Sequence, residues 1–118
     1  MIRLNAEILD IFDGFTVGGK EVPVRFMNYE GHGEPYVIFM RESDDSSYSG
    51  DDSLIGYVTY YDFDVYSRGN FTALVEAVKS RLESAGWTWQ PSRSSADMYE
   101  SDTGYFHVTL SFAKERGV

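Results

Sequence analysis

Two stretches of the chain alternate apolar and polar residues with a period of two. They are residues 54–66 and 105–113, and each collects aromatic and aliphatic side chains on one side. Successive side chains of a β-strand point to opposite faces, so this alternation predicts two strands that each bury one face. Two shorter apolar runs, 22–28 and 36–42, predict further strands. Pro23 has no backbone N–H to donate, so the first of them lies at a sheet edge or begins at this residue.

Helical spacing marks two other segments. Apolar residues recur at i, i+3, i+4 and i+7 through residues 70–85, which predicts an amphipathic helix. Asn70 is a favourable N-cap for it, and Gly86 stands where a left-handed residue would end it. A shorter pattern of the same kind predicts a helix near residues 3–12.

The order of these elements indicates the fold class. Helices and strands are segregated along the chain rather than alternating, which is typical of an α+β fold. The 118 residues fit a single domain, 1–118, with one core large enough to support it. We therefore expect a mostly antiparallel sheet of four to five strands with two helices packed on one face.

An acidic segment, residues 42–53, separates the second and third predicted strands. Its sequence is ESDDSSYSGDDS, which has no apolar periodicity. This composition predicts a mobile or conditionally ordered loop.

The charge balance narrows the possible partners. The chain has 19 acidic and 10 basic residues, so phosphate backbones repel it and direct sequence-specific DNA binding is disfavoured. It has no cysteine, which excludes disulfides, thiolate metal sites and a cysteine nucleophile. We expect neither a signal peptide nor a membrane span, so the default location is the cytoplasm. Aromatic residues make up 16% of the chain, which favours a binding or assembling protein.

Asp62 and Asp64 are the first candidates for a chemical site. Carboxylates two residues apart on a strand point the same way, as a Mg²⁺ site needs. A metal nuclease also needs a third acidic or histidine ligand and usually a lysine, and the sequence marks none of them. We therefore favour the solvated polar face of a strand, without metal or catalysis.

The other candidate motifs fail on spacing. If Gly50 is aligned as the turn glycine of an EF-hand, Gly56 falls beside the place where the ligating Glu belongs. His32 and His107 are the only histidines, and neither has a spaced partner. The chain has no G-x-S-x-G elbow and no phosphate-binding loop. We expect no cofactor and no enzymatic activity.

Several segments together resemble one family. They are DVYSRGNFTAL (64–74), LESAGWTW (82–89) and DTGYFHVTLSFAKER (102–116). The most characteristic pieces are Asp64-Val65-Tyr66-Ser67 and Tyr99-Glu100-x-Asp102-Thr103-Gly104-Tyr105-x-His107. With the strands before them, they resemble the small tail terminator proteins of long-tailed, non-contractile phages and prophages, also called tail completion or head-tail joining proteins.

The resemblance implies structural work in virion assembly. Proteins of this kind form a ring, usually a hexamer, that caps the tail tube protein, ends tube polymerisation and presents a surface to the head-completion or neck protein. DNA passes through the ring without specific binding, and an acidic lumen would avoid trapping it. The implied location is the tail-neck region of the virion, and the host cytoplasm during assembly. In such a ring Asp62 and Asp64 would line the lumen or pair with a neighbour's arginine.

The acidic segment supplies the remaining candidate interface residues. One hypothesis is that it orders against a neighbouring subunit or the tail tube, and the alternative is a solvated spacer. Tyr48 would be its apolar anchor, and its acids would speed docking to a basic partner. These residues are Asp44, Asp45, Tyr48, Asp51 and Asp52.

A function of another class fits the charge as well. A small acidic inhibitor or DNA mimic would use its carboxylates to imitate phosphates and occupy a nucleic-acid-processing enzyme. Size discriminates between the two functions, because the mimic should be a monomer or dimer and the terminator a ring.

Overall fold

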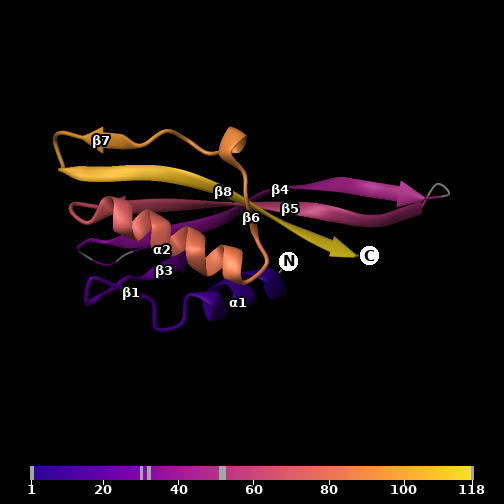
Figure 1. Ribbon diagram of the computed structural model, residues 1–118, viewed down its shortest axis with the longest axis horizontal. Helices are drawn as coiled ribbons and strands as arrows, with labels where there is room; N and C mark the ends of the chain where they lie inside the picture. The colour runs from indigo at the N-terminus through magenta and orange to yellow at the C-terminus, as the bar shows by residue number, and fades with distance from the viewer. Residues whose placement is uncertain (1, 30, 32, 51–52, 118) are drawn as a thin grey trace.

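The molecule is built around a long β-hairpin that runs almost its whole length (Figure 1). The structure, a computed structural model, describes residues 2–29, 31, 33–50 and 53–117. The strands of the central sheet are β3 (Val24–Phe26), β4 (Tyr36–Gly50), β5 (Ser53–Ser67), β6 (Thr88–Trp89), β7 (Met98–Glu100) and β8 (Tyr105–Gly117). Their order is β3-β4-β5-β8-β6, and β7 also pairs with β8. All neighbours are antiparallel except β3 and β4, which are parallel.

This topology confirms the α+β class and adjusts the expected strand number. The sheet has six strands rather than four to five. The alternation of Trp87 and Trp89 predicts the short strand β6, whereas β7 has three residues, too few to show such a pattern. Pro23 precedes β3 at the sheet edge, as expected for a residue without an N–H. A separate hairpin joins β1 (Thr16–Val17) and β2 (Lys20–Glu21).

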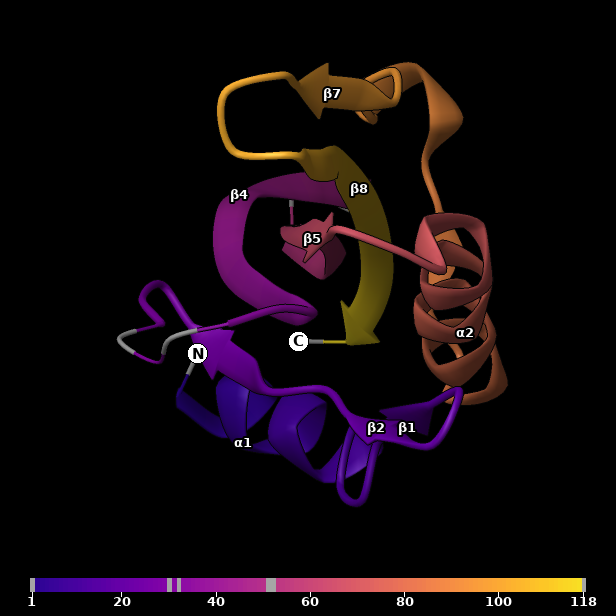
Figure 2. The ribbon, with the colours of Figure 1, turned by 90° about the vertical axis from the view of Figure 1, so that its left-hand side faces the viewer.

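The two helices cover the apolar face of the curved sheet from two sides (Figure 2). They are α1 (Ile2–Ile11) and α2 (Phe71–Ser84). Both reach the same core, which is centred on the fully buried rings of Phe39, Phe63 and Phe112. The alternation predicted for β5 is confirmed, since Tyr61, Phe63 and Val65 point into this core. Burial of such side chains contributes roughly 1.5–3 kcal/mol each, so these rings dominate the stability of the fold.

The predicted ends of α2 are in place, but one works differently. Gly86 has a φ of 91° just after the helix, the left-handed conformation that glycine adopts at low cost. Asn70 precedes the helix with a φ of 53°, and its side chain makes no capping hydrogen bond. Asn70 therefore serves as a residue tolerant of the left-handed region rather than as a side-chain cap.

The prediction of a loop over residues 42–53 is wrong for the residues that the structure describes. β4 continues to Gly50 and β5 begins at Ser53, so two paired strands run past the core. Asp44 helps to hold this register, because its carboxylate accepts hydrogen bonds from Thr59 (2.7 Å) and Arg41 (2.8 Å). An alternating pattern arises only when one face of a strand is buried. Residues 42–50 lack this pattern, although they pair with β5.

The continuation forms an arm, defined here as residues 43–50 and 53–60 together with their β8 partners 113–117. The arm extends beyond both helices and gives the molecule dimensions of 54 × 27 × 24 Å (Figure 1). Register shifts in β4 at Arg41/Ser43 and at Ser46/Tyr48 interrupt its ladder. Such bulges bend a strand and strengthen its twist.

Candidate functional site

The face of the sheet opposite the helices carries polar and aromatic side chains. Asp62 lies opposite Ser111, Asp64 opposite Thr109, and Tyr66 opposite His107, across the β5–β8 pair. This arrangement confirms that the two aspartates share one face of a strand whose other face is buried. We call these six residues, with Tyr36, the polar sheet face.

Four aromatic rings stack across the strands of this face. Tyr36 stacks on Tyr29 (4.8 Å between ring centroids) and on Tyr66 (4.7 Å). Tyr66 stacks in turn on His107 at 4.3 Å with an interplanar angle of 4°. Burial, followed by the nearby Asp64 carboxylate, raises the pKa of Tyr66 to about 12. Burial also raises the pKa of Tyr36. Tyr36 and Tyr66 therefore keep their hydroxyl protons at physiological pH.

Asp64 is held by its neighbours on β8. Its Oδ1 accepts a hydrogen bond of 2.6 Å from the Thr109 hydroxyl, and Nε2 of His107 lies 4.0 Å away. The sequence predicts a solvated strand face, but the Asp64 carboxylate is only partly exposed to water and is hydrogen-bonded to Thr109. Cross-strand pairing with Thr109 and partial burial fix this carboxylate within the sheet.

Asp62 belongs to a cluster that joins three elements. Glu42 of β4 forms an ion pair with Arg93 of the 3₁₀ helix η1 (Pro91–Arg93), whose guanidinium lies 3.8 Å from the centroid of the Tyr60 ring. Asp62 lies beside Glu42, and its Oδ1 is buried without a hydrogen-bond partner among the described residues. Burial, then the Glu42 charge and a hydrogen bond with it, raises the pKa of Asp62 to about 6.

The candidate residues of the acidic segment are only partly covered by the structure. Asp44 bonds within its own chain, as described above. Asp45 and Tyr48 have backbone positions in β4, while their side chains lie outside what the structure describes. Asp51 and Asp52 lie outside the described residues. So does His32, the second histidine, whereas His107 lies on the polar sheet face as predicted.

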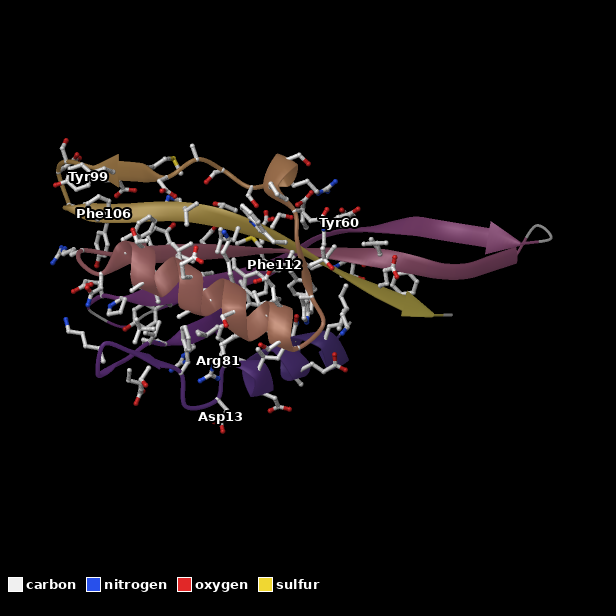
Figure 3. The ribbon with its side chains drawn as sticks, viewed as in Figure 1. Asp13, Tyr60, Arg81, Tyr99, Phe106 and Phe112 are labelled. Carbon is white, nitrogen blue, oxygen red and sulfur yellow. The ribbon has the colours of Figure 1, made fainter. Side chains whose placement is uncertain are left out.

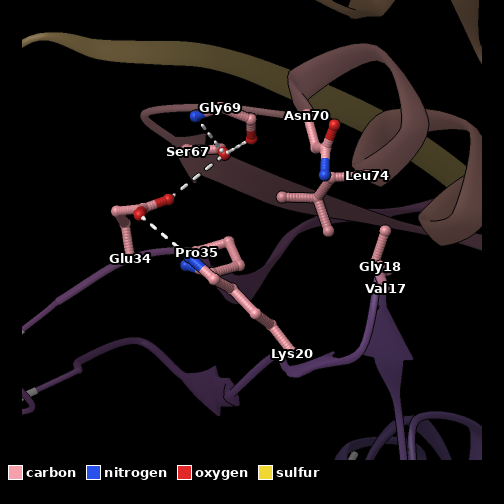
Figure 4. A pocket seen from close by; sticks show the side chains of 9 residues that line it. All are labelled: Val17, Gly18, Lys20, Glu34, Pro35, Ser67, Gly69, Asn70 and Leu74. Atoms are coloured by element: carbon pink, nitrogen blue, oxygen red, sulfur yellow. Dashed lines mark hydrogen bonds and ion pairs between the residues drawn. The ribbon is translucent and has the colours of Figure 1, made fainter.

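A hollow of about 240 Å³ lies where β5 leads into α2 (Figure 4). Glu34 projects into it and accepts hydrogen bonds from the Arg68 backbone N–H (3.0 Å) and the Ser67 hydroxyl (3.4 Å). Lys20 approaches the same carboxylate at 3.8 Å. These hydrogen bonds and the ion pair use the charges of Glu34 and Lys20 within the chain. They fix the turn before α2 and leave no free charge in the hollow for a ligand.

The described side chains give little basis for a metal or catalytic site. No group of three or more Asp, Glu, His or Cys side chains could hold a metal ion in the described part of the chain. Within those same residues no helix is long and apolar enough to span a membrane. Fold and surface define a small α+β protein with a stacked polar sheet face and a projecting arm.

The comparison with protein families assigns the chain. The model of the family described as "Tail completion protein gp17" matches residues 21–113, so the chain belongs to this family. Membership gives it a structural role in a phage tail, contacts with tail and head components, and a place in the tail of the virion. The match confirms the resemblance noted in the sequence. The comparison with curated proteins gives no significant match.

Sequence reasoning missed two features of the surface. Arg93 drew no prediction, although it is one of only ten basic residues in an acidic chain. Tyr99 and Phe106 were assigned to a family texture and a buried strand face, yet both are exposed. Figure 3 places them together at the end of the sheet away from the arm. Their rings pack against each other with centroids 4.9 Å apart.

Proposed function

We propose that this protein forms a closed ring of six identical copies on the last ring of the tail tube. The ring ends tube polymerisation and provides the surface that the head-completion or neck protein joins. The protein assembles in the host cytoplasm, from a phage or a prophage genome, and remains in the tail-neck region of the virion.

The observation that carries this proposal is the family match over residues 21–113, which spans the central sheet from β3 into β8 together with α2 and leaves out α1. A protein that completes a tail must meet the tube at one surface and the head components at another. A small single-domain subunit presents two such surfaces most readily when copies are arranged in a ring about the tube axis.

The charge of the chain fits a channel for DNA. With a net charge of −9, a ring of this protein surrounds DNA with carboxylates rather than bases. Binding to DNA depends on lysine and arginine replacing the counterions of phosphates, so such a lumen lets DNA pass without holding it. In the proposed ring the polar sheet face, with Asp62 and Asp64, faces the lumen.

The arm is the proposed docking element. Tyr48 is its apolar anchor, and Asp44, Asp45, Asp51 and Asp52 give it the charge to approach a basic surface on the tail tube. Asp45 and Val58 are cross-strand partners, so an Asn-Gly turn can join them directly in place of residues 46–57. This shortened protein should stay folded and should no longer cap tubes.

Two measurements test the function. Native mass spectrometry of the intact protein should give a closed oligomer, and electron microscopy of polymerising tail tube protein should show tubes of limited length when the protein is added. A chain that stays monomeric or dimeric and leaves tube length unchanged contradicts the ring. Tight binding to a nucleic-acid-processing enzyme in that case would favour the acidic inhibitor. Normal capping by the shortened protein, with unchanged salt dependence, would make the arm a spacer.

A further inference from the structure

Large apolar side chains remain exposed at two opposite edges of the sheet. Figure 1 shows β3 and β7, the strands at these edges. The first group, here the β3-edge surface, lies on β3, just after it, and on the adjoining helix α1. The second group, the β7-edge surface, lies on β7 and at the start of β8. The β3-edge surface consists of Leu9, Phe26 and Met27, and the β7-edge surface of Met98, Tyr99 and Phe106. Exposed apolar patches on a soluble protein mark interaction sites.

We infer that the β3-edge surface of one copy binds the β7-edge surface of the next copy. The inference rests on the proposed ring and names the contact that closes it. Two different surfaces at opposite edges of one sheet form a head-to-tail contact, and repetition of such a contact by a fixed rotation closes a ring. A two-fold dimer would instead need one surface that fits itself.

One edge carries an exposed side chain and the other a groove. Met27 follows β3 with 60% of its surface exposed, so it projects from the sheet edge. At the other edge Phe106 lines an open groove of about 760 Å³ between the start of α2 and the segment before β7. Phe71 stacks on Phe106 at 5.5 Å and supplies the apolar wall of this groove. A projecting methionine suits such a groove, because its flexible thioether side chain adapts to irregular apolar surfaces.

The charges of the two edges favour the head-to-tail pairing through Arg25, although Asp13 and Glu21 line the same surface hollow as Leu9 and Arg25. Arg25, next to Phe26, donates to the carbonyl oxygen of Val24 and forms no ion pair within the described chain. The β7 edge carries Asp97 and Asp102, which likewise form no ion pair with any described residue. Two β7 edges would repel each other, whereas the β3 edge brings a cation to these carboxylates.

The backbone at Met27 supplies a further argument. Met27 has a φ of 62°, a left-handed conformation that is costly for a residue with a side chain. Hydrogen bonds from the N–H groups of Met27 (to Phe39 O, 2.9 Å) and Asn28 (to Phe26 O, 2.7 Å) hold it there. A conformation that favours glycine, occupied by an exposed apolar side chain, indicates that the side chain is kept for a contact.

Cross-linking tests the contact directly, because the chain has no cysteine of its own. Met27→Cys and Tyr99→Cys are made separately and mixed with a short bismaleimide. The mixture should give a covalent dimer, while each variant alone should give little. A chain with both cysteines should give a ladder of oligomers that ends at the ring size. Efficient cross-linking of Tyr99→Cys with itself would overturn the head-to-tail contact.

Assembly of substituted proteins gives the second test. Met27→Gly removes the projecting side chain and suits the left-handed backbone, so it should fold as stably as the parent. It should nevertheless raise the concentration for half-assembly at least tenfold, and Tyr99→Asp should do the same. Ser80→Asp adds the same charge on the exposed surface of α2 and should assemble like the parent. Thermal melts confirm that each variant is folded.

The outcomes separate this inference from the proposed function. If the parent forms rings while Met27→Gly and Tyr99→Asp assemble equally well, the ring stands and this contact is wrong. If the parent forms no ring in solution or on tail tubes, both fail. Loss of assembly in the two edge variants, together with the mixed cross-link, supports the contact.

Discussion

Replacing Asp62 with asparagine should stabilise the protein at neutral and alkaline pH. The Asp62 carboxyl is packed beside Glu42 and Asp64, and Arg93 is the cation that offsets them. On the β8 side it faces Ser111, an uncharged residue. Burial, followed by the Glu42 charge, raises the pKa of Asp62 to about 6, so the folded chain binds this proton more tightly than the unfolded chain does.

The direction of the pH effect follows from this difference. Because the folded-state pKa is raised, the contribution of Asp62 to stability is greatest below about pH 4. It is lost as the pH rises toward about 6, where the folded protein must also ionise. A shift of about two pKa units corresponds to roughly 3 kcal/mol at most. Asp62 retains some contact with water, so we expect about 1–2 kcal/mol after screening.

Urea unfolding, followed by the fluorescence of the buried Trp87, measures the effect. Asparagine resembles the protonated acid, so the variant and the parent should agree near pH 3.5. By pH 8 the variant should be more stable by about 1–2 kcal/mol, a midpoint shift of roughly 1 M urea. Points near pH 4.5 are avoided, because that is the isoelectric pH and the protein would associate there.

A matched variant separates burial from net charge. Glu83→Gln removes one negative charge from the exposed surface of α2, and its difference from the parent corrects for the overall change in charge. The reasoning is refuted if Asp62→Asn differs from the parent by the same amount at pH 3.5 and pH 8. It is also refuted if the stability of Asp62→Asn relative to the parent falls as the pH rises.

Three further predictions concern the core, a link between the helices and the absence of a metal site. Val78→Asp places a carboxylate in the fully buried face of α2 and should cost roughly 3 kcal/mol or more, and a melt like that of the parent would contradict this packing. Arg81→Ala removes hydrogen bonds to the backbone oxygens of Ile11 (2.7 Å) and Asp13 (3.2 Å), and Figure 3 shows Asp13 close to Arg81. It should lower the free energy of unfolding by about 1–3 kcal/mol, and an unchanged urea midpoint would show that these bonds contribute nothing. Titration calorimetry with Mg²⁺ or Mn²⁺ should show no tight binding, whereas a micromolar isotherm abolished by Asp62→Asn would establish a metal site at the aspartates.

The sequence predicted well those elements that bury one side. β5, β8 and α2 carry the period of two or of 3.6 that a core imposes, and their positions agree with the structure to within a few residues. The β4 side of the arm was missed because residues 42–50 continue the strand without the alternation that a buried face imposes. Strand pairing there depends on the partner strand β5, and the local sequence pattern of residues 43–50 does not indicate that partner.

The candidate site shows the same division. The shared face of Asp62 and Asp64 could be predicted, because it follows from the period of a single strand. The Glu42–Arg93 pair could not be, since its members are 51 residues apart in the sequence. The parallel pairing of β3 with β4 was equally invisible, because apolar runs do not specify strand direction.

The continuity of β4, β5 and β8 from the core into the arm has a mechanical consequence. The arm has no hinge loop at its base in the described residues, since β4, β5 and β8 all run through the core boundary; the β5–β8 pairing keeps its register there, and β4 carries a bulge at Arg41/Ser43. A load applied along the arm is therefore carried by the ladder of backbone hydrogen bonds into the stacked rings of Tyr36, Tyr66 and His107. In the proposed ring such an arm would act as a lever rather than a tether, and the angle at which it docked would set the tilt of the whole subunit.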